Sequence, residues 1–147
     1  MSHVRQQIRV ALATKVTGLA TTGSNVFQNR TQMVTDANLP CLIIASESDE
    51  AQSISLSYPR LTARIANFSI RVLAKATTDL DNVLDGICLN VEKALASDTS
   101  LGGLTKDLQL MNTSIAFNSD NETHYGEAAM NWSATYYIQE TAPDTAL

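Results

Sequence analysis

The chain has 147 residues, of which 44% are hydrophobic and 17% charged, and its formal net charge at pH 7 is −5. This length and composition predict one globular domain with a core large enough to fold without disulfides or a metal. The negative charge argues against a surface that grips nucleic acid, and no apolar run approaches the roughly 20 residues that a membrane span requires.

The first forty residues are predicted to form one helix and one short strand. Apolar residues recur at helical spacing from His3 to Leu19, and Gly18 marks the end of this helix. A short strand is predicted within residues 25–30. Residues 31–40 are polar and end in proline, which indicates a loop.

The next stretch is predicted to contain two strands around an acidic excursion. The run "CLIIAS", residues 41–46, is short and apolar, which is typical of a strand covered on both faces. The polar run "SESDEAQS", residues 46–53, is interpreted as a solvated excursion. In "SISLSYP", residues 53–59, apolar residues alternate with serines, which predicts a half-buried strand.

The stretch from Arg60 to Ala76 is long enough for one strand or two. Its apolar residues share one parity up to Ile65 and the other parity from Phe68 onward. Such a change predicts a β-bulge or a sharp bend near Ala66 and Asn67, and therefore one bent strand or two strands that share a corner.

Residues 78–96 carry the clearest helical stripe of the sequence. Thr77 or Thr78 is predicted to cap the helix, and Asp79 and Asp81 lie in its first turn, where the helix dipole favours negative charge.

Two antiparallel strands, residues 108–117 and 126–138, are predicted to follow this helix, joined by a polar hairpin loop. One face of the pair is expected to meet the helices and the other to meet water or a neighbouring chain. The element order predicts the α+β class: a mostly antiparallel sheet with two main helices packed on it. We expect a single domain over residues 1–139 and a short mobile tail, 140–147.

Cys41 directly follows a proline, which raises the question of whether it is a nucleophile. An activated thiol needs a nearby histidine or helix N-terminus, and no local motif links Cys41 to His3 or His124. We therefore interpret Cys41 and Cys88 as small apolar residues of the core. Two cysteines and an N-terminus without a signal peptide predict synthesis in a reducing cytoplasm.

No other pattern in the sequence predicts catalysis, a cofactor or a metal. There is no C-x-x-C, no H-x-x-x-H and no phosphate-binding G-x-x-x-x-G-K, and the acidic run 47–50 lacks the spacing of a calcium loop. Three arginines, Arg60, Arg64 and Arg71, lie along one predicted strand. They are interpreted either as partners for acids of a neighbouring chain or as ordinary solvent-facing charges.

What remains is a protein that acts through its surfaces. The long terminal hairpin and the excursion 46–60 are the candidate contact surfaces. The residues predicted to lie at an interface are Glu47, Asp49, Glu50, Tyr58, Arg60 and Arg64.

The order of segments over nearly the whole chain resembles a known family. An amphipathic helix, the strand "LPCLII" and an acidic stretch precede the passage from Arg60 to Ala96, which includes "TTDLDNVLDGICLNVEKAL". "LGGLTKDLQLMNTSIAFNSD" and "AAMNWSATYYI" then close the domain. This order is similar to that of the tail terminator family of long-tailed bacteriophages, the lambda-like minor tail proteins.

The resemblance implies a structural virion protein with no enzymatic activity and no cofactor. It implies a homo-hexameric ring in the neck region of the tail, assembled in the cytoplasm of the bacterial host. Its implied partners are the major tail tube protein, whose polymerisation the ring stops, and the head-completion protein. Double-stranded DNA is expected to pass through the pore without sequence-specific binding, and an acidic lumen would let it slide.

Two rival interpretations stay open. A neck or head-completion connector protein would share the size, fold class and ring symmetry but would cap a different partner. A small ligand-binding or enzymatic α+β domain would need a deep pocket with converging polar groups.

Overall fold

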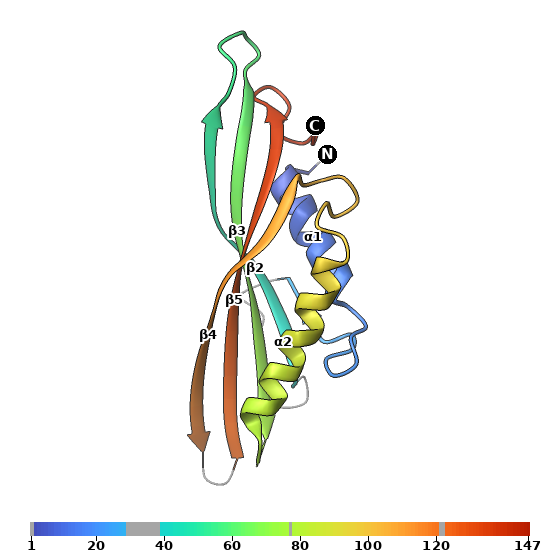
Figure 1. Cartoon of the computed structure of the whole chain (residues 1–147), viewed down its shortest axis with the longest axis vertical. Helices are drawn as coiled ribbons and strands as arrows, with labels where there is room; N and C mark the ends of the chain where they lie inside the picture. Colours follow the sequence, from blue (N-terminus) through green and yellow to red (C-terminus); the bar gives the residue numbers. More distant parts are fainter. Residues whose placement is uncertain (1, 29–38, 77, 121–122) are drawn as a thin grey trace.

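A computed structural model describes residues 2–28, 39–76, 78–120 and 123–147 and shows an α+β domain (Figure 1). Five strands form one sheet in the order β1-β2-β3-β5-β4, in which β1 pairs with β2 in parallel and all other pairs are antiparallel. The predicted fold class is therefore confirmed. The elements are α1 (Val4–Val16), β1 (Val26–Phe27), β2 (Cys41–Ser53), β3 (Leu61–Ala76), α2 (Leu80–Ala96), β4 (Asp107–Asp120) and β5 (Thr123–Gln139).

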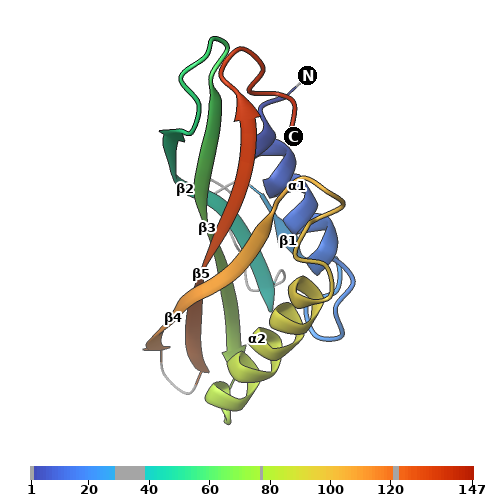
Figure 2. The same cartoon turned by 45° about the horizontal axis from the view of Figure 1, so that its top comes forward.

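Both helices lie on the same face of a long, twisted sheet (Figures 1 and 2). Strand alternation explains the core between these layers, because successive side chains of a strand point to opposite faces. Along β5 every second residue from Ala128 to Ile138 is buried under the helices. The helices contribute apolar stripes, namely Val4, Ile8, Leu12 and Val16 from α1 and Leu84, Ile87, Val91 and Leu95 from α2.

The hairpin of β2 and β3 extends beyond the helices at one end of the molecule (Figure 1). We call residues 48–67, which form this projecting hairpin, the arm. Its two strands pair from Ser48↔Asn67 to Ser53↔Thr62, and the loop 54–60 joins them at the tip. The hairpin of β4 and β5 lies at the opposite end of the molecule, beside the start of α2 (Figure 1).

The acidic run predicted as an excursion is a strand. Residues 46–53 continue β2 because they form a ladder with β3, and this pairing outweighs the low strand propensity of the polar residues. The run 53–59 was predicted to be a strand, but residues 54–60 form the loop of the arm. That prediction is wrong because residues 55–59 make no backbone–backbone hydrogen bond within the described part of the chain.

The sequence predicts a bulge near Ala66 and Asn67, which lie in β3. The structure has a bulge at this level of the sheet, but in the neighbouring strand β2. β3 runs in unbroken register with β5 over its whole length, whereas β2 has a register shift between Ser46 and Ser48, opposite Phe68 and Asn67. The apolar residues of β3 change parity because they change face. The early ones, including Ile65, lie on the sheet face away from the helices, whereas those of the other parity, from Phe68 onward, are buried on the helix-bearing face.

Two smaller expectations also differ from the structure. Asp79 rather than Thr78 occupies the N-cap position of α2, and its side chain makes no capping hydrogen bond; Thr77 lies outside the described residues. The strands β4 and β5 extend into the predicted polar loop, as far as Asp120 and from Thr123.

The segment 140–147, expected to be mobile, contacts the rest of the fold. The Pro143 carbonyl accepts a hydrogen bond from the Val4 amide at 2.9 Å, and the Leu147 amide donates to the Tyr137 carbonyl at 3.0 Å. The segment thereby covers part of the outer edge of β5, where β4 does not reach. No described helix is long and apolar enough to cross a membrane.

Candidate assembly surfaces

The two cysteines lie in the core. Cys41 is fully buried on β2, and Cys88 is 8% exposed on α2. Burial raises the pKa of both thiols to about 11, so the thiolate that nucleophilic chemistry needs is disfavoured at neutral pH. Cys41 is therefore best explained as a packing residue.

Among the described residues, no three His, Cys, Asp or Glu side chains gather in a way that could hold a metal. His3 has a structural role at the start of α1, where its Nδ1 accepts a hydrogen bond from the Arg5 amide at 3.0 Å. Burial lowers the pKa of His3, assisted by the positive charges of Arg5 and Arg64. A neutral imidazole suits this contact because Nδ1 must remain unprotonated to accept.

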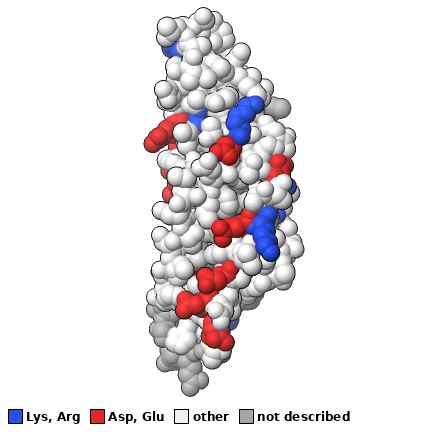
Figure 3. Space-filling view, viewed as in Figure 1, with Lys and Arg blue, Asp and Glu red and all other residues white. Residues whose placement is uncertain are grey.

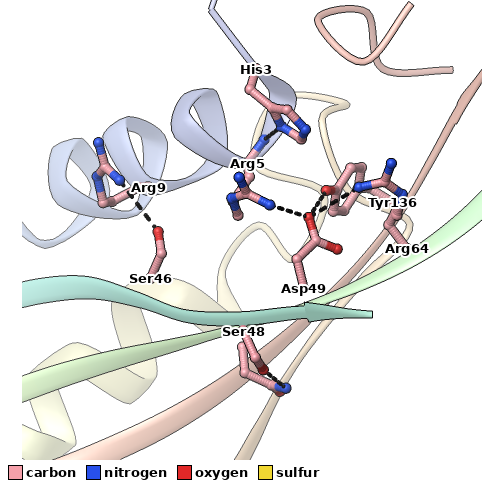
Figure 4. Close-up of polar contacts among 9 residues, drawn as sticks. His3, Arg5, Arg9, Ser46, Ser48, Asp49, Arg64 and Tyr136 are labelled. Carbon is pink, nitrogen blue, oxygen red and sulfur yellow. Dashed lines mark hydrogen bonds and ion pairs between the residues drawn. The ribbon is translucent and has the colours of Figure 1, made fainter. Parts of the chain in front are cut away.

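A polar cluster around Asp49 joins α1 to the base of the arm (Figure 4). The Asp49 side chain is 5% exposed, and its Oδ2 lies 2.8 Å from Nη1 of Arg5 and 3.4 Å from Nη1 of Arg64. The Tyr136 hydroxyl donates a third hydrogen bond to the same oxygen. Beside the cluster, Arg9 donates to the Ser46 hydroxyl at 3.3 Å.

The bulge in β2 explains why Asp49 points at the helix. Before the bulge, the even-numbered residues of β2 face the helices, as Leu42 and Ile44 do. The inserted residue, Glu47, reverses this alternation, so Asp49 faces the helix layer. Burial of a carboxylate is costly unless it is paired, and here two guanidinium groups and a phenol provide the pairing.

The six residues predicted to lie at an interface fall into two groups. Asp49 and Arg64 bind each other inside the protomer. The other four are exposed: Glu47 accepts from the Ser69 hydroxyl, Arg60 lies 3.6 Å from Glu140, Glu50 lies on the outer face of the arm, and Tyr58 lies at its tip.

The sheet face away from the helices carries a second ion pair. Arg71 binds Glu127 through two hydrogen bonds of 2.6 and 3.0 Å between neighbouring strands. The hydrogen bonds from Arg71 lower the pKa of the Glu127 carboxyl. From its strand position, Arg71 was expected either to pair with an acid of a neighbouring chain or to face solvent. It pairs instead with an acid of its own chain.

Exposed large apolar side chains form two groups of three, and Val10, Ile65, Leu89 and Leu147 are exposed elsewhere. At the arm tip, Leu56 is 96% exposed and Tyr58 is 80% exposed, and Ile54 is also exposed. The second group lies on β4, where Met111, Ile115 and Phe117 are exposed. The alternation of the first group is visible in the sequence, but it predicted a half-buried strand and not an exposed loop. It missed the β4 group, because an exposed edge strand and a covered one have similar sequences.

Acidic side chains gather over α2 on the face shown in Figure 3. The exposed acids of this region are Asp79, Asp81, Asp85 and Glu92. Strand β2 adds the exposed Glu47 and, within the arm, Glu50. A surface of this charge repels the phosphates of DNA.

Comparison with known proteins identifies one family. The model of the family described as phage minor tail protein U matches residues 2–136. No curated protein matches the sequence. A solved chain from the virion of a native gene transfer agent (GTA) particle is similar over 90% of this chain and 92% of its own length, with 13% identity and a TM-score of 0.35. A likeness at this TM-score carries no argument about function.

Proposed function

Because this chain belongs to the phage minor tail protein U family, a family of structural tail proteins, we propose that it caps the head-proximal end of the tail tube as a hexameric ring. The ring ends polymerisation of the tube protein, presents a joining surface to the head-completion complex, and leaves a pore for double-stranded DNA. The observation that carries this proposal is the family match over residues 2–136.

The shape of the protomer supports a ring. A closed ring of identical subunits needs a contact between two different surfaces of the chain. This molecule is long, and its ends differ: the arm projects at one end, and the β4–β5 hairpin lies at the other (Figure 1). Each end also exposes large apolar side chains.

The charge of the chain supports passage of DNA. The net charge is −5, and exposed acids lie along α2 and on the outer side of the arm. If these acids line the channel, replacing them with neutral residues should slow DNA ejection without blocking tail assembly. Asp49 must be kept because it is an internal ion-pair partner. The test therefore compares two double variants, Glu47→Gln/Glu50→Gln and Asp81→Asn/Asp85→Asn. The pair whose replacement slows DNA ejection faces the channel. Unchanged ejection kinetics for both variants would exclude a channel role for these four acids.

The experiment that tests the ring is negative-stain electron microscopy of the purified protein, alone and mixed with its tail tube protein. Six-fold rings, or a distinct cap on tubes of fixed length, are the expected result. If the protein never marks a tube end but binds isolated head-completion complexes, the connector interpretation replaces this one.

A further inference from the structure

We propose that residues 53–58 of one protomer pair with the open edge of β4 in the next protomer and add a sixth strand to its sheet. This inference rests on the proposed ring and specifies the contact that closes it. The donor is the tip of the arm, and the acceptor is the outer edge of β4.

The acceptor edge carries no charge, and the register shift of β4, between Leu110 and Asn112, precedes the stretch that holds Ile115 and Phe117. In the described structure β4 pairs only with β5, so the opposite side of the strand presents unpaired backbone groups. Proteins usually guard such edges with charges or proline, yet no charged residue and no proline lies between Asp107 and Asp120. An exposed edge with this composition is expected to be covered in the assembled state.

The apolar side chains of β4 lie where an added strand would cover them. Ile115 pairs with the buried Ala128 and Phe117 with the buried Gly126, so both point to the helix-bearing face. They remain exposed because β4, although it contacts α2, is the edge strand of the described sheet, with no strand beyond it (Figure 2).

The donor has the matching pattern. Ile54, Leu56 and Tyr58 alternate with serines, so in an extended conformation they share one face. Within the described chain, residues 55–58 make no backbone–backbone hydrogen bond, so their amides and carbonyls can bond to a neighbour, whereas the Ile54 amide already donates to the Leu61 carbonyl. The segment has the usual length of a strand, and Pro59 ends it.

The other edges of the sheet do not offer an equal site. The exposed edge of β2 carries the charged residues Glu47 and Glu50, which discourage pairing. The free end of β5 is covered by the segment 140–147. Donor and acceptor lie at opposite ends of one chain, so the contact is head-to-tail, as a closed ring requires.

Two variants of the full chain test the contact by complementation. Leu56→Lys disables the donor, and Ile115→Lys disables the acceptor; both positions are exposed, so circular dichroism should show intact folds. Each variant alone should be monomeric in sedimentation velocity. Their equimolar mixture should form a heterodimer, because one intact donor then meets one intact acceptor. Leu89→Lys, on the exposed side of α2, is the matched control and should assemble like the unmodified chain.

Cysteine cross-linking gives an independent readout in tails isolated from cells, whether or not the free protein forms rings. Oxidation of Leu56→Cys/Ile115→Cys should give a ladder of linked protomers, whereas Leu56→Cys/Leu89→Cys should not. The native cysteines are buried and serve as a silent background.

The outcomes separate this contact from the ring itself. Rings that form from either lysine variant, or rings without a ladder, overturn the contact and leave the ring in place. If Ile115→Lys rings form but no longer cap tubes, the β4 edge holds the tube protein and not a second copy. If the unmodified chain neither forms rings nor caps tubes, the proposed function fails, and this contact fails with it.

Discussion

Both helices pack on the sheet through apolar stripes, but α1 adds a cluster of charged groups. α1 meets the base of the arm through charged groups, with Asp49 bound by Arg5 and Arg64. α2 packs on β3 and β5 with apolar side chains such as Leu84 and Ile87. Charged contacts depend on exact partners, whereas apolar packing depends on volume. Removing one ion-pair partner should therefore destabilise the contact between α1 and the arm. Adding side-chain volume should destabilise the packing of α2 on the sheet.

The largest expected effect is the loss of Asp49. Asp49→Ala leaves two guanidinium groups and the Tyr136 hydroxyl without their shared acceptor, which should lower the free energy of unfolding by about 3 kcal/mol. This is the low end of the range for buried pairs, because Arg5 and Arg64 retain access to water. Urea denaturation measures it. Glu50→Ala, on the exposed face of the same strand, should change stability by less than about 0.5 kcal/mol, and equal losses for both variants would refute a special role of the cluster.

A finer change to the same cluster removes a single hydrogen bond. Tyr136→Phe keeps the buried ring but deletes the hydroxyl that donates to Asp49. A hydrogen bond to a charged group contributes about 1.5–3 kcal/mol, so we expect a loss near the lower value. Tyr137→Phe is the control, since this neighbour faces the other side of the sheet. A cluster contribution is disproved if the two substitutions cost the same in thermal unfolding.

The α2 end should respond to added volume. A Cβ on Gly126 would lie 2.8 Å from Cδ1 of Leu84 and 3.0 Å from Cδ2 of Leu80. Gly126→Ala should therefore destabilise the protein by about 1 kcal/mol, because the leucine ends must shift. Gly86→Ala is the matched control, with nothing within 4 Å of its new methyl group, and should stabilise α2 by about 0.5–1 kcal/mol. A stabilising Gly126→Ala would show that this packing is loose.

The smallest effect is expected at the Arg71–Glu127 pair, which has charged partners but lies on the exposed face. The pair lowers the pKa of Glu127, so its contribution is present above the ordinary glutamate pKa and is lost as the pH falls through the lowered value. Exposure limits the contribution to less than about 1 kcal/mol. Glu127→Gln should thus reduce stability at pH 7 and match the unmodified chain near pH 2. A difference that does not depend on pH would assign the effect to packing.

The sequence predicted the elements whose pattern is local. The α2 stripe and the alternation of β5 both follow from spacing along a single segment. The Asp49 cluster could not be predicted in this way, because Arg5 lies 44 residues from Asp49, and Tyr136 lies 87 residues from it. The bulge that aims Asp49 at α1 depends on pairing with β3, which the sequence of β2 alone does not reveal.

At the arm, a local pattern predicted a strand that the protomer does not form. Ile54, Leu56 and Tyr58 have the alternation of a strand, but alternation predicts a strand only where a neighbouring strand supplies hydrogen bonds. Among the described residues, only the Ile54 amide of this segment finds such a partner, the Leu61 carbonyl, and residues 55–58 make no backbone–backbone hydrogen bond. The polar residues of 46–53 lack the pattern, yet they form a strand because β3 lies beside them.

The uncharged edge of β4 also determines how readily the unassembled protein aggregates during storage. An exposed edge strand without guarding charges is a template for pairing with identical chains, and stacking of this kind is effectively irreversible. Protomers held at high concentration without their partners should therefore convert slowly into insoluble aggregates, faster at higher concentration and more slowly in Ile115→Lys. The shelf life of the purified chain thus depends on the same strand that, within a tail, is expected to be covered.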